Sequence, residues 1–179
     1  MNQDLQNIFN SIEKPENIKK IFVTGGKSSD LPKTLNGLPV SHKNEIDSIA
    51  LGAKQLYDLK ESALIVSTGT GTACVHFDGM NGNHLGGIAV GGGMLCGLGS
   101  LLLKNDNALE IDEFAEKGDK SKIDFLIGDV VNKIGNLSPE ITAANFGKAV
   151  NSEFATMENV AASLCNMIGE VIGTIAYLN

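Results

Sequence analysis

The sequence predicts an α/β fold whose short strands lead into glycine-rich turns and whose C-terminal half is mainly helical. Two apolar runs, Lys20–Thr24 and Ala63–Ser67, each end at a glycine-containing turn, which is typical of buried strands. Apolar residues recur at three- and four-residue steps from Glu45 to Leu59 and again over residues 157–175, which predicts two helices. A chain of 179 residues can bury one substantial core or form two small lobes that share a cleft.

The shorter elements follow from capping and turn residues. Residues 3–13 are expected to form a short amphipathic helix, and Leu38–Ser41 a further strand. Asn44 stands where the N-cap of the 45–59 helix belongs. After the Gly/Thr turn at 68–72, Ala73–Phe77 should return as a strand, and the Asp-Gly and Asn-Gly pairs at 78–82 predict a second hairpin. Residues 100–150 are expected to be mostly helical, with charged breaks.

Composition narrows the class of protein. The net charge of −7 argues against a general binder of nucleic acid or of anionic membranes, because such surfaces need an excess of Lys and Arg. The three cysteines form no CxxC pair, so a disulfide framework or a zinc site is not expected, and a reduced, cytoplasmic setting fits. Asn166 and Glu170 interrupt the apolar C-terminal segment, which favours a buried core helix over a membrane span.

Two glycine-rich elements about twenty residues apart favour a phosphate site. The turn from Thr68 to Thr72 lies between two strands, where its glycines can expose consecutive N–H groups and its threonines add hydroxyl donors. Gly91–Gly93 opens a second element, a helix over 94–103, whose free N–H groups and positive dipole end would face another phosphate. Neither a Walker loop nor a dinucleotide fingerprint is present. A structural explanation stays open: the glycines can simply permit tight packing of helix on sheet.

Polar candidates flank these glycines. Glu45, with Asp47 two residues on, opens a helix whose dipole favours an ionised carboxylate, which suits a base accepting a proton from a substrate hydroxyl. A helix-start carboxylate without chemistry is equally consistent with the sequence. His84 directly precedes the glycine run and could reach an anion. The three histidines form no metal-binding motif, which makes a metal site held by them improbable.

Several motifs in order resemble the type II pantothenate kinases. They are FVTGG (22–26), NEID (44–47), STGTGT (67–72), HLGGIAVGGGMLCGLGSLL (84–102), KGD (117–119) and TAANFG (142–147). The resemblance runs from about residue 18 to the C-terminus. It implies the actin-like ATPase (ribonuclease H-like) fold of the sugar kinases, present in part, with 1–179 as a single kinase-like region.

The same resemblance implies an activity and roles for individual residues. The activity is transfer of the ATP γ-phosphoryl group to pantothenate, the first step of coenzyme A synthesis, with Mg²⁺ expected on the phosphates. Glu45 would be the general base and His84 a substrate-binding residue. The phosphate-binding set implied is Thr70, Gly71, Thr72, Gly92, Gly93, Met94, Leu95 and Cys96. A cytoplasmic homodimer formed through the helix at 156–177 is also implied.

Three departures from the family pattern are visible. No DxGGT-type phosphate loop precedes KIFVTGG, no GSS-type adenosine loop follows the last helix, and His84 stands where the family usually has an arginine. Two other functions therefore remain open. One is a catalytically incomplete relative that binds a pantetheine- or CoA-type ligand or needs a complementing polypeptide. The other is a structural role, in which the chain assembles with itself or a partner.

Overall fold

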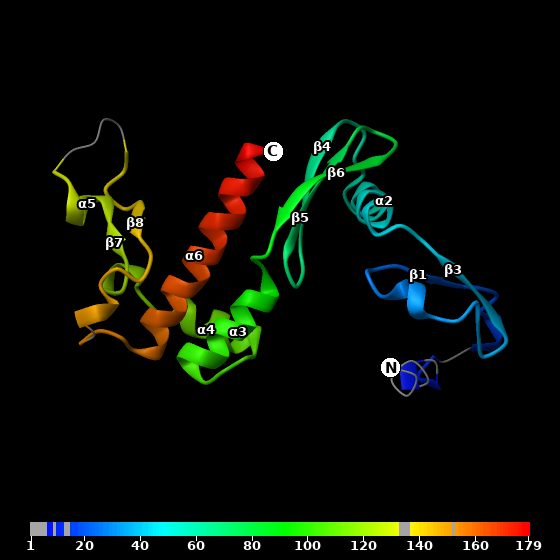
Figure 1. The fold of residues 1–179 in the computed structure, drawn as a ribbon, viewed down its shortest axis with the longest axis horizontal. Coiled ribbons are helices and arrows are strands. Elements are labelled where there is room, and N and C mark those ends of the chain that lie inside the picture. The colour runs from blue at the N-terminus through cyan, green and yellow to red at the C-terminus, as the bar shows by residue number, and fades with distance from the viewer. Residues whose placement is uncertain (1–6, 9, 13–14, 133–136, 152) are drawn as a thin grey trace. The chain divides into compact units, whose positions relative to one another are not determined.

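The computed structural model describes residues 7–8, 10–12, 15–132, 137–151 and 153–179. The helix expected at 3–13 falls largely outside these ranges. Figure 1 shows the described elements in chain order. The strands are β1 Ile21–Val23, β2 Thr34–Leu35, β3 Leu38–His42, β4 Ala63–Thr68, β5 Thr72–Phe77, β6 Gly82–Ile88, β7 Phe125–Leu126 and β8 Thr142–Ala144. The helices are α2 Glu45–Tyr57, α3 Gly92–Leu103, α4 Ala108–Ala115, α5 Ile127–Val130 and α6 Met157–Leu178, with short 3-10 turns at Pro15–Asn17, Ser28–Asp30, Lys120–Lys122 and Ala149–Asn151.

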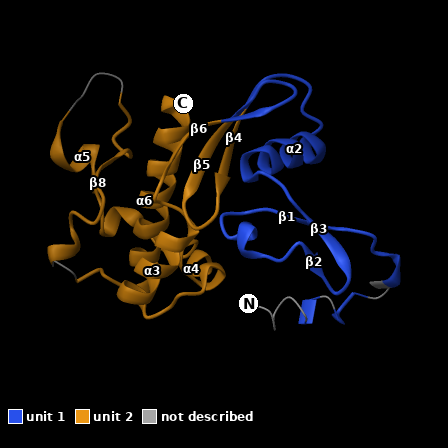
Figure 2. Ribbon diagram, turned by 45° about the vertical axis from the view of Figure 1, so that its right-hand side comes forward, with its two compact units in different colours: residues 1–63, 76–83 blue, residues 64–75, 84–179 orange. Residues whose placement is uncertain are grey.

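The chain divides into two compact units (Figure 2). Unit 1 comprises residues 1–63 and 76–83, and unit 2 comprises residues 64–75 and 84–179. The mixed α/β composition that the sequence predicts is confirmed. The predicted strands at 63–67 and 73–77 and the second hairpin are also confirmed, as β4, β5 and β6, which form one three-stranded sheet in that order.

Unit 1 contains a small mixed sheet in the order β1-β3-β2. β1 pairs parallel with β3, and β2 pairs antiparallel with it. The strand predicted at Lys20–Thr24 is confirmed, but the prediction that it is buried is wrong, because β1 is an edge strand and Phe22 is exposed. The predicted helix and cap are confirmed in α2, where the Asn44 side chain accepts hydrogen bonds from the N–H groups of Ile46 and Asp47.

Unit 2 has its core where α3, α4 and α6 meet. Leu103 of α3, Ile111 of α4 and Ala161 of α6 are buried together, and Figure 1 shows α3 and α4 beside the first half of α6. Gly99 permits this close approach, because a Cβ atom there would lie 2.4 Å from the Ile111 side chain. The helix predicted from Gly91–Gly93 onward is confirmed as α3, with Gly91 as its N-cap residue.

The prediction that residues 100–150 are mostly helical is wrong. After α4 the chain forms a 3-10 turn, the two-stranded β7–β8 sheet, the four-residue helix α5 and connecting turns. Local side chains favour turns here, as the Asp119 carboxylate accepts a hydrogen bond from the Ser121 N–H. Pro139, which disfavours a helix interior, lies within the same stretch.

The long C-terminal helix is confirmed as α6, but only its first half is a core element. Ala161, Ser163, Leu164 and Ile168 are buried, whereas Tyr177 and Leu178 are largely exposed. Among the helices of the described residues, α6 alone has the length and apolar composition to cross a membrane. That is weak support for a span, because a core helix of a soluble protein meets the same criteria.

Candidate active site

In unit 2 the glycine-rich turn and the start of α3 are joined by main-chain hydrogen bonds. The N–H groups of Gly92 and Gly93 donate to the carbonyl oxygens of Gly69 and Thr70, at 2.7 and 3.0 Å. The turn is closed on itself by a bond of 2.8 Å from the Gly69 N–H to the Gly71 carbonyl. The two elements, which lie about twenty residues apart in the sequence, therefore form one hydrogen-bonded junction.

Glycine is required at this junction by close contact between backbones. A Cβ atom at Gly91 would lie within 2.9 Å of the Gly69 and Gly71 carbonyl oxygens, and one at Gly87 would lie 2.5 Å from the Thr72 carbonyl oxygen. One at Gly93 would lie 2.8 Å from the Thr70 carbonyl oxygen. Contacts this short exclude any side chain unless the turn moves away from α3. The packing explanation of the glycines is therefore realised, and it is compatible with an anion site on the outer side of the turn.

The two threonines of the turn have different surroundings. Thr72 is buried, and its hydroxyl donates to the Val90 carbonyl oxygen at 2.8 Å and lies 3.4 Å from the Thr68 hydroxyl. Thr70 is exposed, and its hydroxyl has no hydrogen-bond partner within the described part of the chain. Thr72 thus fixes the junction from inside, whereas Thr70 presents its hydroxyl to solvent.

The N-terminus of α3 offers fewer free donors than the sequence predicts. The N–H groups of Gly92 and Gly93 are already bonded to the turn, and that of Leu95 is bonded to the Gly91 carbonyl oxygen. In the described ranges, the N–H groups of Thr70 and Met94 have no acceptor. Cys96 lies one turn into the helix and is half-buried. The N–H groups of Thr70 and Met94 are therefore donors available to an anion, supported by the positive end of the α3 dipole.

The remaining predicted residues lie elsewhere on the chain. His84 belongs to β6 in unit 2 and is exposed, and its ring has no hydrogen-bond partner among the described residues. Glu45 is the first residue of α2 in unit 1, where its carboxylate is exposed. Unit 2 therefore contains all residues predicted to bind phosphate, and Glu45 belongs to unit 1.

Unit 1 has a hollow of about 460 Å³ beside the start of α2. Lys43, Asn44, Asp47 and Ser48 line it from one side, and the tip of the β5–β6 hairpin at residues 80–82 lines it from another. Glu45 is not among the lining residues. The Lys54 ammonium joins helix and hairpin by donating to the Gly79 carbonyl oxygen at 3.0 Å.

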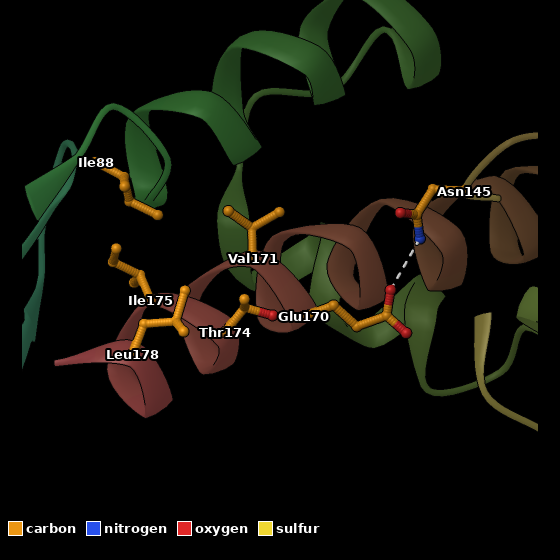
Figure 3. Close-up of a pocket in the computed structure, with 7 residues that line it drawn as sticks. All are labelled: Ile88, Asn145, Glu170, Val171, Thr174, Ile175 and Leu178. Atoms are coloured by element: carbon orange, nitrogen blue, oxygen red, sulfur yellow. Dashed lines mark hydrogen bonds between the residues drawn. The ribbon is translucent and has the colours of Figure 1, made fainter. Parts of the chain in front are cut away.

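A second pocket, in unit 2, was not predicted from the sequence. It has a volume of about 380 Å³ and an apolar wall formed by Ile88 and by the exposed half of α6 (Figure 3). Its polar end is formed by Asn145 and Glu170, whose side chains are joined by a hydrogen bond of 3.2 Å. Ile88 lies three residues before the Gly91 cap, so the pocket adjoins the glycine junction along the chain. The residues that form this pocket are far apart in the sequence, and of the motifs noted above TAANFG contributes Asn145.

The candidate site contains no arginine side chain. All fourteen basic residues of the 179-residue chain are lysines, so a bidentate guanidinium clamp on a phosphate cannot come from this chain. No group of three or more His, Cys, Asp or Glu side chains is arranged to hold a metal ion in the described ranges. The groups of the junction that could hold an anion are therefore backbone N–H groups, hydroxyls and the helix dipole.

These features define an α/β protein with a glycine-rich junction of turn and helix, and comparison with known proteins identifies its family. The model of the Fumble family matches residues 54–179, which contain the whole glycine junction and all of α6. The chain therefore belongs to the Fumble family, the family of the type II pantothenate kinases, as its motifs indicated.

Individual relatives agree with this assignment. The chain is 31% identical over 169 residues to the protein named type II pantothenate kinase of Staphylococcus aureus strain USA300, and the same values apply to the proteins of strains NCTC 8325 / PS 47 and COL. The match covers 90% of this chain and 62% of each relative. The chain thus spans a little under two thirds of the length of these relatives.

Proposed function

We propose that the chain carries the phosphoryl-transfer site of a pantothenate kinase, which moves the γ-phosphoryl group of ATP to the primary hydroxyl of pantothenate. Family membership and the names of the relatives support this activity. The observation that carries it is the junction of turn and helix, where Thr70 and Met94 keep free donors beside the N-terminus of α3. We place both units in one kinase-like region with an actin-like fold, working in the cytoplasm.

Each residue of the set has a proposed role. Thr70, with Gly71 beside it, and Met94 contact the phosphates, while Thr72, Gly92, Gly93, Leu95 and Cys96 give the junction its shape. His84 is a proposed substrate contact, because its exposed ring is free to approach an anion. Mg²⁺ is proposed to accompany the nucleotide, bound mainly by phosphate oxygens, as this cation usually keeps few protein ligands.

Glu45 is the proposed general base. Glu45 is the first residue of α2, and its exposed carboxylate is accessible to an approaching hydroxyl. General-base catalysis contributes about 10²- to 10⁴-fold to a rate. Glu45→Gln keeps the shape of the side chain but cannot accept the proton.

The test measures formation of phosphopantothenate by mass spectrometry from ATP, Mg²⁺ and pantothenate. We expect the full chain to form product and Glu45→Gln to lose about 10²-fold or more in kcat. Asp47→Asn is the matched control, because Asp47 is also exposed in the first turn of α2, and its rate should stay within about threefold. Full activity of Glu45→Gln would exclude it as the base. Binding of pantothenate or CoA without turnover would favour the incomplete relative instead.

Dimer formation through α6 is proposed as well. The second half of the helix exposes Tyr177, which does not line the pocket of Figure 3 and is an aromatic side chain of the kind that an interface buries. Sedimentation velocity should show a dimer for the full chain and a shift toward monomer for Tyr177→Lys. A monomeric wild-type chain at micromolar concentration would contradict the proposal.

A further inference from the structure

Asp124 is a fully buried carboxylate that lies outside the glycine junction. One carboxylate oxygen accepts hydrogen bonds from the Phe146 N–H, at 2.8 Å, and from the Ser163 hydroxyl. The other accepts from the Asn166 amide at 3.4 Å. Every partner is a donor, which is what a carboxylate acting only as an acceptor requires. Asp124 thus joins the loop after β8 to the buried half of α6.

The loop that Asp124 holds contains a strained residue. Phe146 has a φ angle of +57°, in the left-handed region that bulky side chains rarely adopt. Such a conformation persists only where the surroundings fix it, and here the Asp124 carboxylate accepts its N–H. The next residue, Gly147, packs so closely that a Cβ atom would lie 2.4 Å from the Phe125 ring. Strained backbone of this kind tends to occur at functional sites.

A chain of polar contacts leads from Asp124 to the pocket of Figure 3. The Asn166 side chain, which donates to Asp124, also accepts a hydrogen bond from the Lys120 ammonium at 2.9 Å. Lys120 lies 3.8 Å from one carboxylate oxygen of Glu170, and the other oxygen accepts from Asn145. Asn145 directly precedes the strained Phe146. Asp124 therefore constrains the polar end of the pocket from two sides, through the backbone of the loop and through α6.

We propose that Asp124 is a positioning residue that holds Asn145 and Glu170 in place for the substrate that occupies this pocket. The proposal rests on the proposed kinase function, and it assigns the pocket to the acceptor rather than to ATP. Ile88 places the pocket beside the glycine junction, and its apolar wall with one hydrogen-bonding end fits an acyl-amide chain better than a polyphosphate. Asp124 itself touches no substrate.

A double variant that swaps the donor and the acceptor of the Asp124–Asn166 hydrogen bond distinguishes a positioning role of Asp124 from a general effect on stability. In Asp124→Asn the introduced amide faces the amide of Asn166, so two donors meet and the contact is lost. Adding Asn166→Asp restores a donor–acceptor pair, and the introduced carboxylate still faces Lys120 and the Thr142 hydroxyl. Asp112→Asn, an exposed change of the same charge on α4, is the control.

The experiment compares KM values for pantothenate and for ATP in the full chain. We expect Asp124→Asn to raise the KM for pantothenate about tenfold, with the KM for ATP within about twofold, and the double variant to recover to within about threefold. Asp112→Asn should match the wild type. Unchanged KM values in Asp124→Asn, equal effects on both substrates, or failure of the double variant to recover would each overturn the inference.

Two further measurements test the role of Asp124 if the variant does not fold or if the wild type is inactive. If Asp124→Asn does not fold, Asn145→Ala at the pocket rim replaces it, and an unchanged pantothenate KM then overturns the inference. If the wild type forms no product, the proposed function fails, and amide hydrogen exchange decides the inference alone. Faster exchange at Phe146 and Asn145 in Asp124→Asn, reversed in the double variant, supports it, whereas equal exchange in all three proteins overturns it.

Discussion

Two glycines in the same helix should respond in opposite ways to alanine. At Gly93 an added Cβ atom would lie 2.8 Å from the Thr70 carbonyl oxygen and methyl group, whereas ordinary contacts begin at 3.4 Å. The turn must therefore move by about 0.6 Å, since 3.4 minus 2.8 is 0.6. At Gly97, four residues further along α3, nothing lies within 4 Å of the same position. Gly97 is therefore a matched control for Gly93.

The cost at Gly93 follows from three contributions. Overpacking costs about 1–3 kcal/mol, and weakening of the two hydrogen bonds from Gly92 and Gly93 to the turn adds up to about 1 kcal/mol each. Replacing glycine by alanine inside a helix returns about 0.5–1 kcal/mol. We therefore expect Gly93→Ala to lower the free energy of unfolding by about 2 kcal/mol and Gly97→Ala to raise it by about 0.5–1 kcal/mol.

Urea denaturation followed by far-ultraviolet circular dichroism measures both changes. The midpoints should move in opposite directions with equal m-values, because the surface exposed on unfolding stays the same. In Gly93→Ala, amide hydrogen exchange should first become faster at residues 69–71 of the turn. Equal stability of Gly93→Ala and the wild type would refute the geometry of the junction. A comparable loss in Gly97→Ala would show that glycine is needed throughout α3 for another reason.

Three other predictions concern single side chains. Thr72→Val should cost about 1 kcal/mol of unfolding free energy by removing the part-buried hydrogen bond to the Val90 carbonyl oxygen. Thr70→Val should keep stability and weaken ATP binding, measured by calorimetry; the reverse pattern would exchange their roles. Asn44→Ala should cost about 1 kcal/mol through loss of the N-cap of α2, and an unchanged melting temperature would contradict this. The hydrogen bond from Lys148 lowers the pKa of Asp129, so this pair stabilises the fold above the unfolded pKa of about 3.9 and is lost as the pH falls further. Lys148→Met should raise the pKa of Asp129 in an NMR titration, and no change would refute the pairing.

The elements predicted correctly from the sequence are those whose capping, turn and apolar residues lie close together in the chain. α2 has its cap and an apolar face within fifteen residues, and β4 and β5 are apolar runs bounded by turn residues. Residues 100–150 lack such a signal, because their structure depends on distant contacts such as that of Asp124 with the start of the 146–147 loop. Burial of β1 was mispredicted because a strand's place at the edge of a sheet is decided by its partners.

The sequence likewise predicted only part of the candidate site. Glycine and threonine spacing was enough to predict the turn and the helix, but it did not reveal that they are joined through the N–H groups of Gly92 and Gly93. Nor did it separate the buried Thr72 from the exposed Thr70. The hydrogen bonds of Asp124 with Phe146, Ser163 and Asn166 were not predicted. A lone carboxylate in the apolar run IDFLI at 123–127 is nevertheless a recognisable sign of a buried polar contact.

The division of the chain into two units has a consequence for the order of folding. Unit 1 takes its last segment, residues 76–83, from beyond the first strand of unit 2. During synthesis it can therefore be completed only after the glycine turn and β5 have emerged, and unit 2 waits for α6. The β4–β5–β6 sheet is thus an early product that both units require. A destabilising change in this sheet should lower the yield of folded protein more than its equilibrium cost predicts.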